Sequence, residues 1–185
     1  MKLGFITSCF PGLTLEEVVG WASATGFEAL EVAAWPTDGN RPFTASHLDA
    51  DQLSESQATK VSKLLADHGM EIASVSYYDN NLHPDPGTRK AINRYVSRCI
   101  EAAALVGSPT VGTFVGRDPT KSVKENLKEA EAIFAPLVEQ AQSAGVKIVI
   151  ENCVMEGWHP DGYPGNLAYS PELWEWMFSI GLFLN

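Results

Sequence analysis

The residue whose type and position most favour chemistry is Glu151, which directly follows the apolar run at residues 146–150. An ionised carboxylate at the end of a buried strand is costly unless a cation or hydrogen bonds compensate its charge. A divalent metal ion would do so, and so would an ion pair with a neighbouring Arg or Lys. The residue pattern alone leaves both interpretations open.

Polar and aromatic residues also follow the other apolar runs of the chain. Trp35 and Tyr77 are suited to the wall of a pocket for a small polar ligand, although aromatics in strands often belong to the core. Arg117 is suited either to clamping a substrate or to a surface ion pair. His83 and His47 lie in polar segments, where a histidine is either solvated or part of a site.

Two connections are long enough to carry functional loops. Residues 35–53 contain Arg41 and His47, and residues 152–169 contain Trp158, His159 and Tyr163. We expect the second connection to fold over the site as a lid that excludes water. The three cysteines, Cys9, Cys99 and Cys153, lack CxxC spacing, so we expect packed, reduced thiols rather than disulfides or a zinc site.

The elements that position these residues alternate between strand and helix. Each predicted helix begins with a capping signal, such as Thr14 with Glu17 or Asp85 before Pro86, and each ends at a glycine. Pro136 predicts a kink within the fourth helix. The predicted strands are residues 2–9, 29–33, 71–77, 110–115 and 146–151, with helices opening at Thr14, Ser54, Asp85, Ser122 and Ser170 and a sixth strand starting at residues 182–184.

This alternation predicts an α/β fold with a mainly parallel sheet, because parallel neighbours need crossover connections. The segment after the first strand has no GxGxxG motif, so dinucleotide binding loses its main support. A complete (β/α)8 barrel needs roughly 250 residues. We therefore expect residues 1–185 to form a single domain, the N-terminal portion of a TIM-type barrel with the first five to six β/α units. The site residues would then meet at the carboxyl ends of the strands.

Composition narrows the classes of partner. The 13 Lys and Arg residues against 23 Asp and Glu residues give a formal net charge of −10, which disfavours nucleic-acid binding. No apolar run approaches the roughly 18 to 20 residues that span a bilayer, and residues 1–6 do not resemble a signal peptide. We expect a cytoplasmic protein with a small-molecule substrate and no membrane or nucleic-acid partner.

Four segments carry a resemblance to a known family. They are residues 149–153 (VIENC), 165–174 (GNLAYSPELW), 79–82 (DNNL) and 111–117 (VGTFVGR). On these segments the chain resembles the sugar phosphate isomerase/epimerase family, which has the xylose isomerase-like TIM barrel and belongs to the endonuclease IV-like superfamily. The resemblance covers essentially the whole chain.

The resemblance implies that Glu151 binds a divalent metal ion (Mn, Mg, Zn or Co) and acts as an acid/base residue. The other implied ligands, an aspartate, a histidine and a second glutamate, would follow residue 185, so we expect the 185-residue chain alone to bind the metal weakly. The extra zinc-binding histidines of endonuclease IV have no counterpart at Tyr77 or Thr113, which disfavours a nuclease. We expect the substrate to contact Trp35, Tyr77, His83, Arg117 and Trp158.

Three functions follow as hypotheses. The first is a metal-dependent isomerase or epimerase that transfers a proton next to the polarised carbonyl of a small sugar, sugar phosphate or polyol. The second is a lyase or dehydratase on the same scaffold, because that reaction also begins by removing a proton. The third is a non-catalytic barrel fragment that self-associates as a homo-oligomer through an exposed strand edge.

Overall fold

The computed structural model describes residues 1–36, 45–154 and 164–179. Five strands form one sheet in the order β1-β2-β3-β4-β5, and every neighbouring pair is parallel. The predicted α/β class is therefore confirmed, as a partial barrel. The elements are β1 (Gly4–Ile6), a 3-10 turn (Thr7–Cys9), α1 (Leu15–Ala24), β2 (Ala29–Ala33), α2 (Glu55–Asp67), β3 (Glu71–Ser76), α3 (Pro86–Val106), β4 (Thr110–Thr113), α4 (Val123–Ser143), β5 (Lys147–Ile150) and α5 (Pro171–Ser179).

The helices begin where capping chemistry predicts. The Thr14 hydroxyl accepts from Glu17 N at 3.2 Å, and Glu17 Oε2 accepts from Thr14 N at 2.8 Å, so two otherwise unpaired N–H groups are satisfied. The same reciprocal pair recurs at Ser54 and Ser122. Such an N-cap contributes about 1 kcal/mol. α4 continues through Pro136 as one helix.

Strand boundaries differ from the sequence prediction. β1 is shorter than expected, since the chain turns into the 3-10 segment at Thr7, whose hydroxyl accepts from Ala33 N at 2.9 Å. β3, β4 and β5 each end one or two residues earlier than predicted. The predicted sixth strand at residues 182–184 lies outside the described residues.

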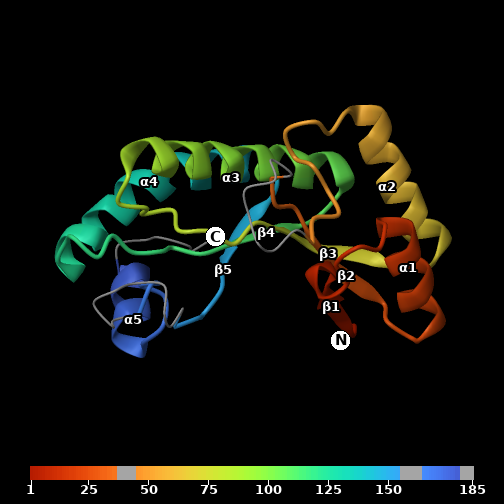
Figure 1. Cartoon of the computed structure of the whole chain (residues 1–185), viewed down its shortest axis with the longest axis horizontal. Coiled ribbons are helices and arrows are strands. Elements are labelled where there is room, and N and C mark those ends of the chain that lie inside the picture. Colours follow the sequence, from red (N-terminus) through yellow and green to blue (C-terminus); the bar gives the residue numbers. More distant parts are fainter. Residues whose placement is uncertain (37–44, 155–163, 180–185) are drawn as a thin grey trace.

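The two faces of the sheet differ in what packs against them. Val32, Val75, Val111 and Ile148 pair across four strands and pack with the helices in the core. The next row is Ala33, Ser76, Gly112 and Val149, which by the alternation of strand side chains points to the opposite face. Helices α1 to α4 follow the covered face, while α1 and α5 lie at opposite ends of the molecule (Figure 1). We call the side opposite the helices α1 to α4 the inner face.

Loops at the carboxyl ends of β3 and β4 are joined by a side-chain amide. Asn80 Oδ1 accepts from Arg117 N at 2.9 Å and from Leu82 N at 3.0 Å, and Asn80 Nδ2 donates to Arg117 O at 2.8 Å. Gly116 lies in the left-handed region (φ +83°), and a Cβ there would collide with Asn80 Oδ1. Only glycine satisfies both constraints.

We predict that Gly116→Ala lowers the free energy of unfolding by about 2–5 kcal/mol, because left-handed strain is added to a steric clash. Gly12→Ala is the matched control, since Gly12 has φ +87° with nothing near its missing Cβ. It should cost only about 1–2 kcal/mol. Urea unfolding of both variants checks this, and equal losses would show that the contact with Asn80 contributes nothing.

Candidate functional site

Two acidic residues and a tyrosine gather on the inner face. Glu31 lies in β2 between Leu30 and Val32, which are fully buried on the covered side. Tyr78 follows β3, and its hydroxyl donates to Glu31 Oε1 at 2.6 Å. A Cβ at Gly112 of β4 would lie 2.5 Å from Tyr78 Oη, so the glycine makes room for the phenol.

Glu151 lies on the same face, at the end of the edge strand β5. It follows β5 directly and its N–H donates to Thr113 O at 3.1 Å, which keeps the end of β5 beside β4. Loss of hydration raises the pKa of the Glu151 carboxyl, and the charge of Glu31 raises this pKa further. Burial and the hydrogen bond to Glu31 raise the pKa of Tyr78, so its hydroxyl stays protonated and remains a donor.

Aromatic rings border this cluster. The Tyr78 ring lies 4.9 Å from Phe114 and 6.0 Å from Trp35, measured between centroids. Trp35, selected from the sequence as a substrate-binding residue, is therefore adjacent to the cluster. The three rings provide an apolar wall beside the two carboxylates.

Tyr77 points elsewhere. Its ring packs edge-on against Tyr95 of α3 at 4.8 Å, and its hydroxyl donates to Asp79 Oδ2 at 2.9 Å. Together with Asp79 and residues of α3 it lines a separate cavity of 610 Å³. The structure thus brings Tyr78, rather than Tyr77, to the inner face with Glu31.

The remaining predicted residues are distributed around the rim. Arg117 Nη1 donates to Pro164 O at 3.3 Å, and this side chain lines a cavity of 260 Å³ with residues of α4 and α5. His83 Nδ1 accepts from Asp85 N at 3.1 Å, at the start of α3. Trp158 and most of the expected lid lie outside the described residues.

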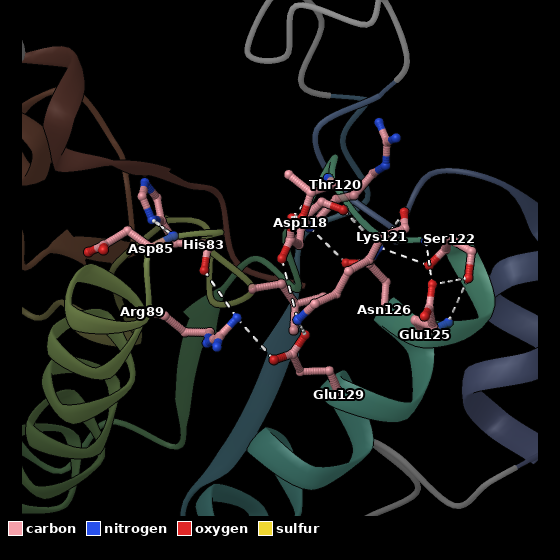
Figure 2. Close-up of polar contacts among 12 residues, drawn as sticks. His83, Asp85, Arg89, Asp118, Thr120, Lys121, Ser122, Glu125, Asn126 and Glu129 are labelled. Atoms are coloured by element: carbon pink, nitrogen blue, oxygen red, sulfur yellow. Dashed lines mark hydrogen bonds and ion pairs between the residues drawn. The ribbon is translucent and has the colours of Figure 1, made fainter.

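The loops around Arg117 are braced by a chain of charges, shown in Figure 2. Arg89 Nη1 lies 3.0 Å from Glu129 Oε1, and Lys121 Nζ lies 2.5 Å from Glu129 Oε2 and 3.4 Å from Asp118 Oδ2. Arg89 Nη1 also donates to His83 O at 3.3 Å. These charges neutralise one another and connect α3 to α4, so we assign the chain a structural role.

Two buried asparagines lie in segments that carried the family resemblance, residues 79–82 and 165–174, although the sequence reasoning gave neither residue a role. Asn81, fully buried, donates to Thr113 Oγ1 at 3.0 Å and to Phe114 O at 2.7 Å. Asn166, also fully buried, accepts from Gly116 N at 3.0 Å and donates to Glu151 O at 3.2 Å. Residue type alone does not indicate these hydrogen bonds, because their partners lie in other segments of the chain.

The expected metal site can be tested against the donors on this face. Within the described ranges, no group of three or more His, Cys, Asp or Glu side chains lies close enough to hold a metal ion. Glu31 is already bonded to Tyr78, and divalent Mg²⁺ or Mn²⁺ prefers about six oxygen ligands. The described residues alone therefore do not fit a metal centre.

None of the described helices is long and apolar enough to cross a membrane.

The sequence and the fold of this chain are similar to those of known proteins. The family model "Xylose isomerase-like TIM barrel" matches residues 19–181. A solved structure described as the probable 3-DHS dehydratase AsbF from Bacillus anthracis is similar, with 16% identity, TM-score 0.68 and 98% of this chain covered. An L-ribulose 3-epimerase is also similar, with 14% identity, TM-score 0.68 and 96% of this chain covered. A D-tagatose 3-epimerase-like protein has 21% identity, TM-score 0.65 and 94% of this chain covered. A search of curated proteins found no match.

The chain spans only part of these structures: 60%, 56% and 58% of their respective lengths. At 14–21% identity the similarity shows a shared fold. The activities named for those proteins belong to them.

We predict that Glu151→Gln stabilises the protein slightly at neutral pH. Because the folded-state pKa of Glu151 is raised, ionisation favours the unfolded state; this penalty is absent below the ordinary glutamate pKa and complete above the raised one. The gain should not exceed about 1 kcal/mol, since the side chain is largely exposed. Thermal unfolding at neutral and acidic pH measures it, with exposed Glu139→Gln as the control. A loss of stability at neutral pH would contradict the assignment.

Proposed function

Because this chain belongs to the xylose isomerase-like TIM barrel family, we propose that it acts as an isomerase or epimerase of a small carbohydrate or polyol. In this proposal Glu151 removes a proton from the carbon next to a carbonyl and returns a proton to the substrate. Sugar phosphates are included in the substrate class. The substrate would lie against the inner face, with Trp35 at its border and Arg117 at the rim.

The observation that carries the proposal is the Glu151 carboxylate at the end of β5, with a raised pKa and Glu31 nearby. A general base works best when its pKa lies near the working pH, and burial or a like charge moves a carboxylate in that direction. On the same face the Tyr78 hydroxyl donates a hydrogen bond to Glu31 Oε1 at 2.6 Å. The inner face thus combines a base with a polar surface suited to sugar hydroxyls.

A divalent metal ion (Mn, Mg, Zn or Co) belongs to the proposal through the family resemblance. Glu151 would be one ligand, and the other ligands would come from outside the described residues. Bound there, the metal would polarise the carbonyl and so make the neighbouring proton more acidic. The proton transfer assigned to Glu151 does not depend on any described residue acting as a second ligand.

A dehydratase is the second candidate, because the similar structure from Bacillus anthracis is described as a probable dehydratase. Both reactions begin with proton removal, so Glu151 would have the same first role. They differ in product: an isomerase or epimerase returns the proton, and a dehydratase releases water. A third candidate is a non-catalytic fragment that self-associates through an exposed strand edge, favoured by the exposure of β5, the last strand of the described sheet, where Val149 is 41% exposed.

We predict that the protein, supplied with Mn²⁺ or Mg²⁺ in D₂O, incorporates deuterium next to the carbonyl of a ketose. D-tagatose and L-ribulose are the first substrates to test, since these sugars appear in the names of similar structures. Glu151→Gln should slow incorporation by about 10²–10⁴-fold, the usual contribution of a general base. Proton NMR follows the exchange.

Glu139→Gln, an exposed carboxylate change on α4, should keep the wild-type rate. Loss of water from the substrate, detected by mass spectrometry, would favour the dehydratase. An equal rate in wild type and Glu151→Gln would exclude Glu151 as the base. No exchange with any ketose, together with a concentration-dependent oligomer, would favour the non-catalytic fragment.

A further inference from the structure

Asn166 connects the loop after β4 to the end of β5. Its side chain is fully buried. Oδ1 accepts from Gly116 N at 3.0 Å and, more weakly, from Ala168 N at 3.4 Å. Nδ2 donates to Glu151 O at 3.2 Å and to Cys153 O at 3.1 Å. One amide therefore serves both as an acceptor for one loop and as a donor for the other.

The hydrogen bonds from Asn166 Nδ2 to the carbonyls of Glu151 and Cys153 fix the direction of the chain after β5. The neighbouring backbone bonds, Glu151 N to Thr113 O and Cys153 N to Ala168 O, are both 3.1 Å long. Without Asn166, the part-buried carbonyls of Glu151 and Cys153 and the buried Gly116 N–H would lose this partner. An unsatisfied buried group costs about 1–3 kcal/mol, so the segment would move to find new partners.

We propose that Asn166 is a positioning residue for Glu151: its amide holds the Glu151 main chain at a fixed height above the inner face and ties it to the segment that carries Arg117. The inference rests on the proposed function, because it assigns Asn166 an effect on the proton transfer by Glu151. The link to Arg117 is direct, since Gly116 precedes Arg117 and the Arg117 main chain is bonded to Asn80. Asparagine is required, because aspartate keeps the acceptor and loses both donors.

The chain offers a matched control in Asn126 of α4, shown in Figure 2. Asn126 is also fully buried; its Oδ1 accepts from Asp118 N at 2.7 Å, and its Nδ2 donates to Asp118 O at 2.9 Å and Ser122 O at 3.0 Å. Asn126→Asp thus removes comparable bonds and adds the same charge. It does so without contacting Glu151.

The experiment compares Asn166→Asp with Asn126→Asp in the full 185-residue chain. Deuterium exchange of backbone amides should show lost protection at Glu151 and Cys153 in Asn166→Asp, and wild-type protection at these two residues in Asn126→Asp. In the sugar exchange assay, Asn166→Asp should lower the maximal rate by about ten- to a hundredfold, as misplacement of a catalytic group does. The half-saturating sugar concentration of Asn166→Asp should stay near wild type, and Asn126→Asp should leave the maximal rate unchanged.

Three outcomes would overturn the inference: a wild-type maximal rate in Asn166→Asp, an equal rate loss in Asn126→Asp, or unchanged protection at Glu151. If the wild-type protein exchanges no ketose, the proposed function fails by itself. Amide protection at Glu151 then still decides whether Asn166 holds this segment.

Discussion

The polar residues of this sheet lie at the carboxyl ends of the strands, where strand pairing stops. There the backbone N–H and C=O groups no longer have hydrogen-bond partners on a neighbouring strand. Buried groups of this kind must find new hydrogen bonds. Here side-chain amides supply them: Asn80 bonds the loops after β3 and β4, and Asn166 bonds the loop after β4 to the end of β5. Gly116 lies between the two amides and has no room for a side chain. The position of Glu151 depends on these hydrogen bonds between the loops.

The chemistry of the inner face depends on three side chains that lie close together: Glu31, Tyr78 and Glu151. The Tyr78 hydroxyl donates to Glu31 at 2.6 Å, and it has room to do so because Gly112 has no side chain. Glu151 lies close enough for the Glu31 charge to raise its pKa. Ionisation of a carboxylate in this setting lowers the stability of the fold, and the raised pKa makes the carboxylate more basic. Perturbed pKa values of this kind are common among acid/base residues.

The sequence predicted the features that depend on neighbouring residues. Helix starts at Thr14, Ser54 and Ser122 were correct because a capping box is complete within four residues. The parallel sheet followed from the alternation of elements. The inner-face cluster was not predictable in this way, because Glu31, Tyr78 and Glu151 meet only through the register of four strands.

Two details show why local patterns were insufficient. Tyr77 and Tyr78 are equivalent by type, and only the end of β3 at Ser76 decides that Tyr78 reaches Glu31 while Tyr77 packs on Tyr95. Asn166 resembles any turn asparagine until its four partners, from three segments, are known.

The central claim is that Glu151 is a base whose acidity is set by the inner face, and carbon-detected NMR titration of its carboxyl group tests this most directly. The account predicts a Glu151 midpoint above the ordinary glutamate value of about 4.3. It also predicts that Glu31→Gln lowers this midpoint, because the nearby charge is lost while an acceptor for Tyr78 is kept. A midpoint at or below the ordinary value, or one that Glu31→Gln leaves unchanged, would contradict the account.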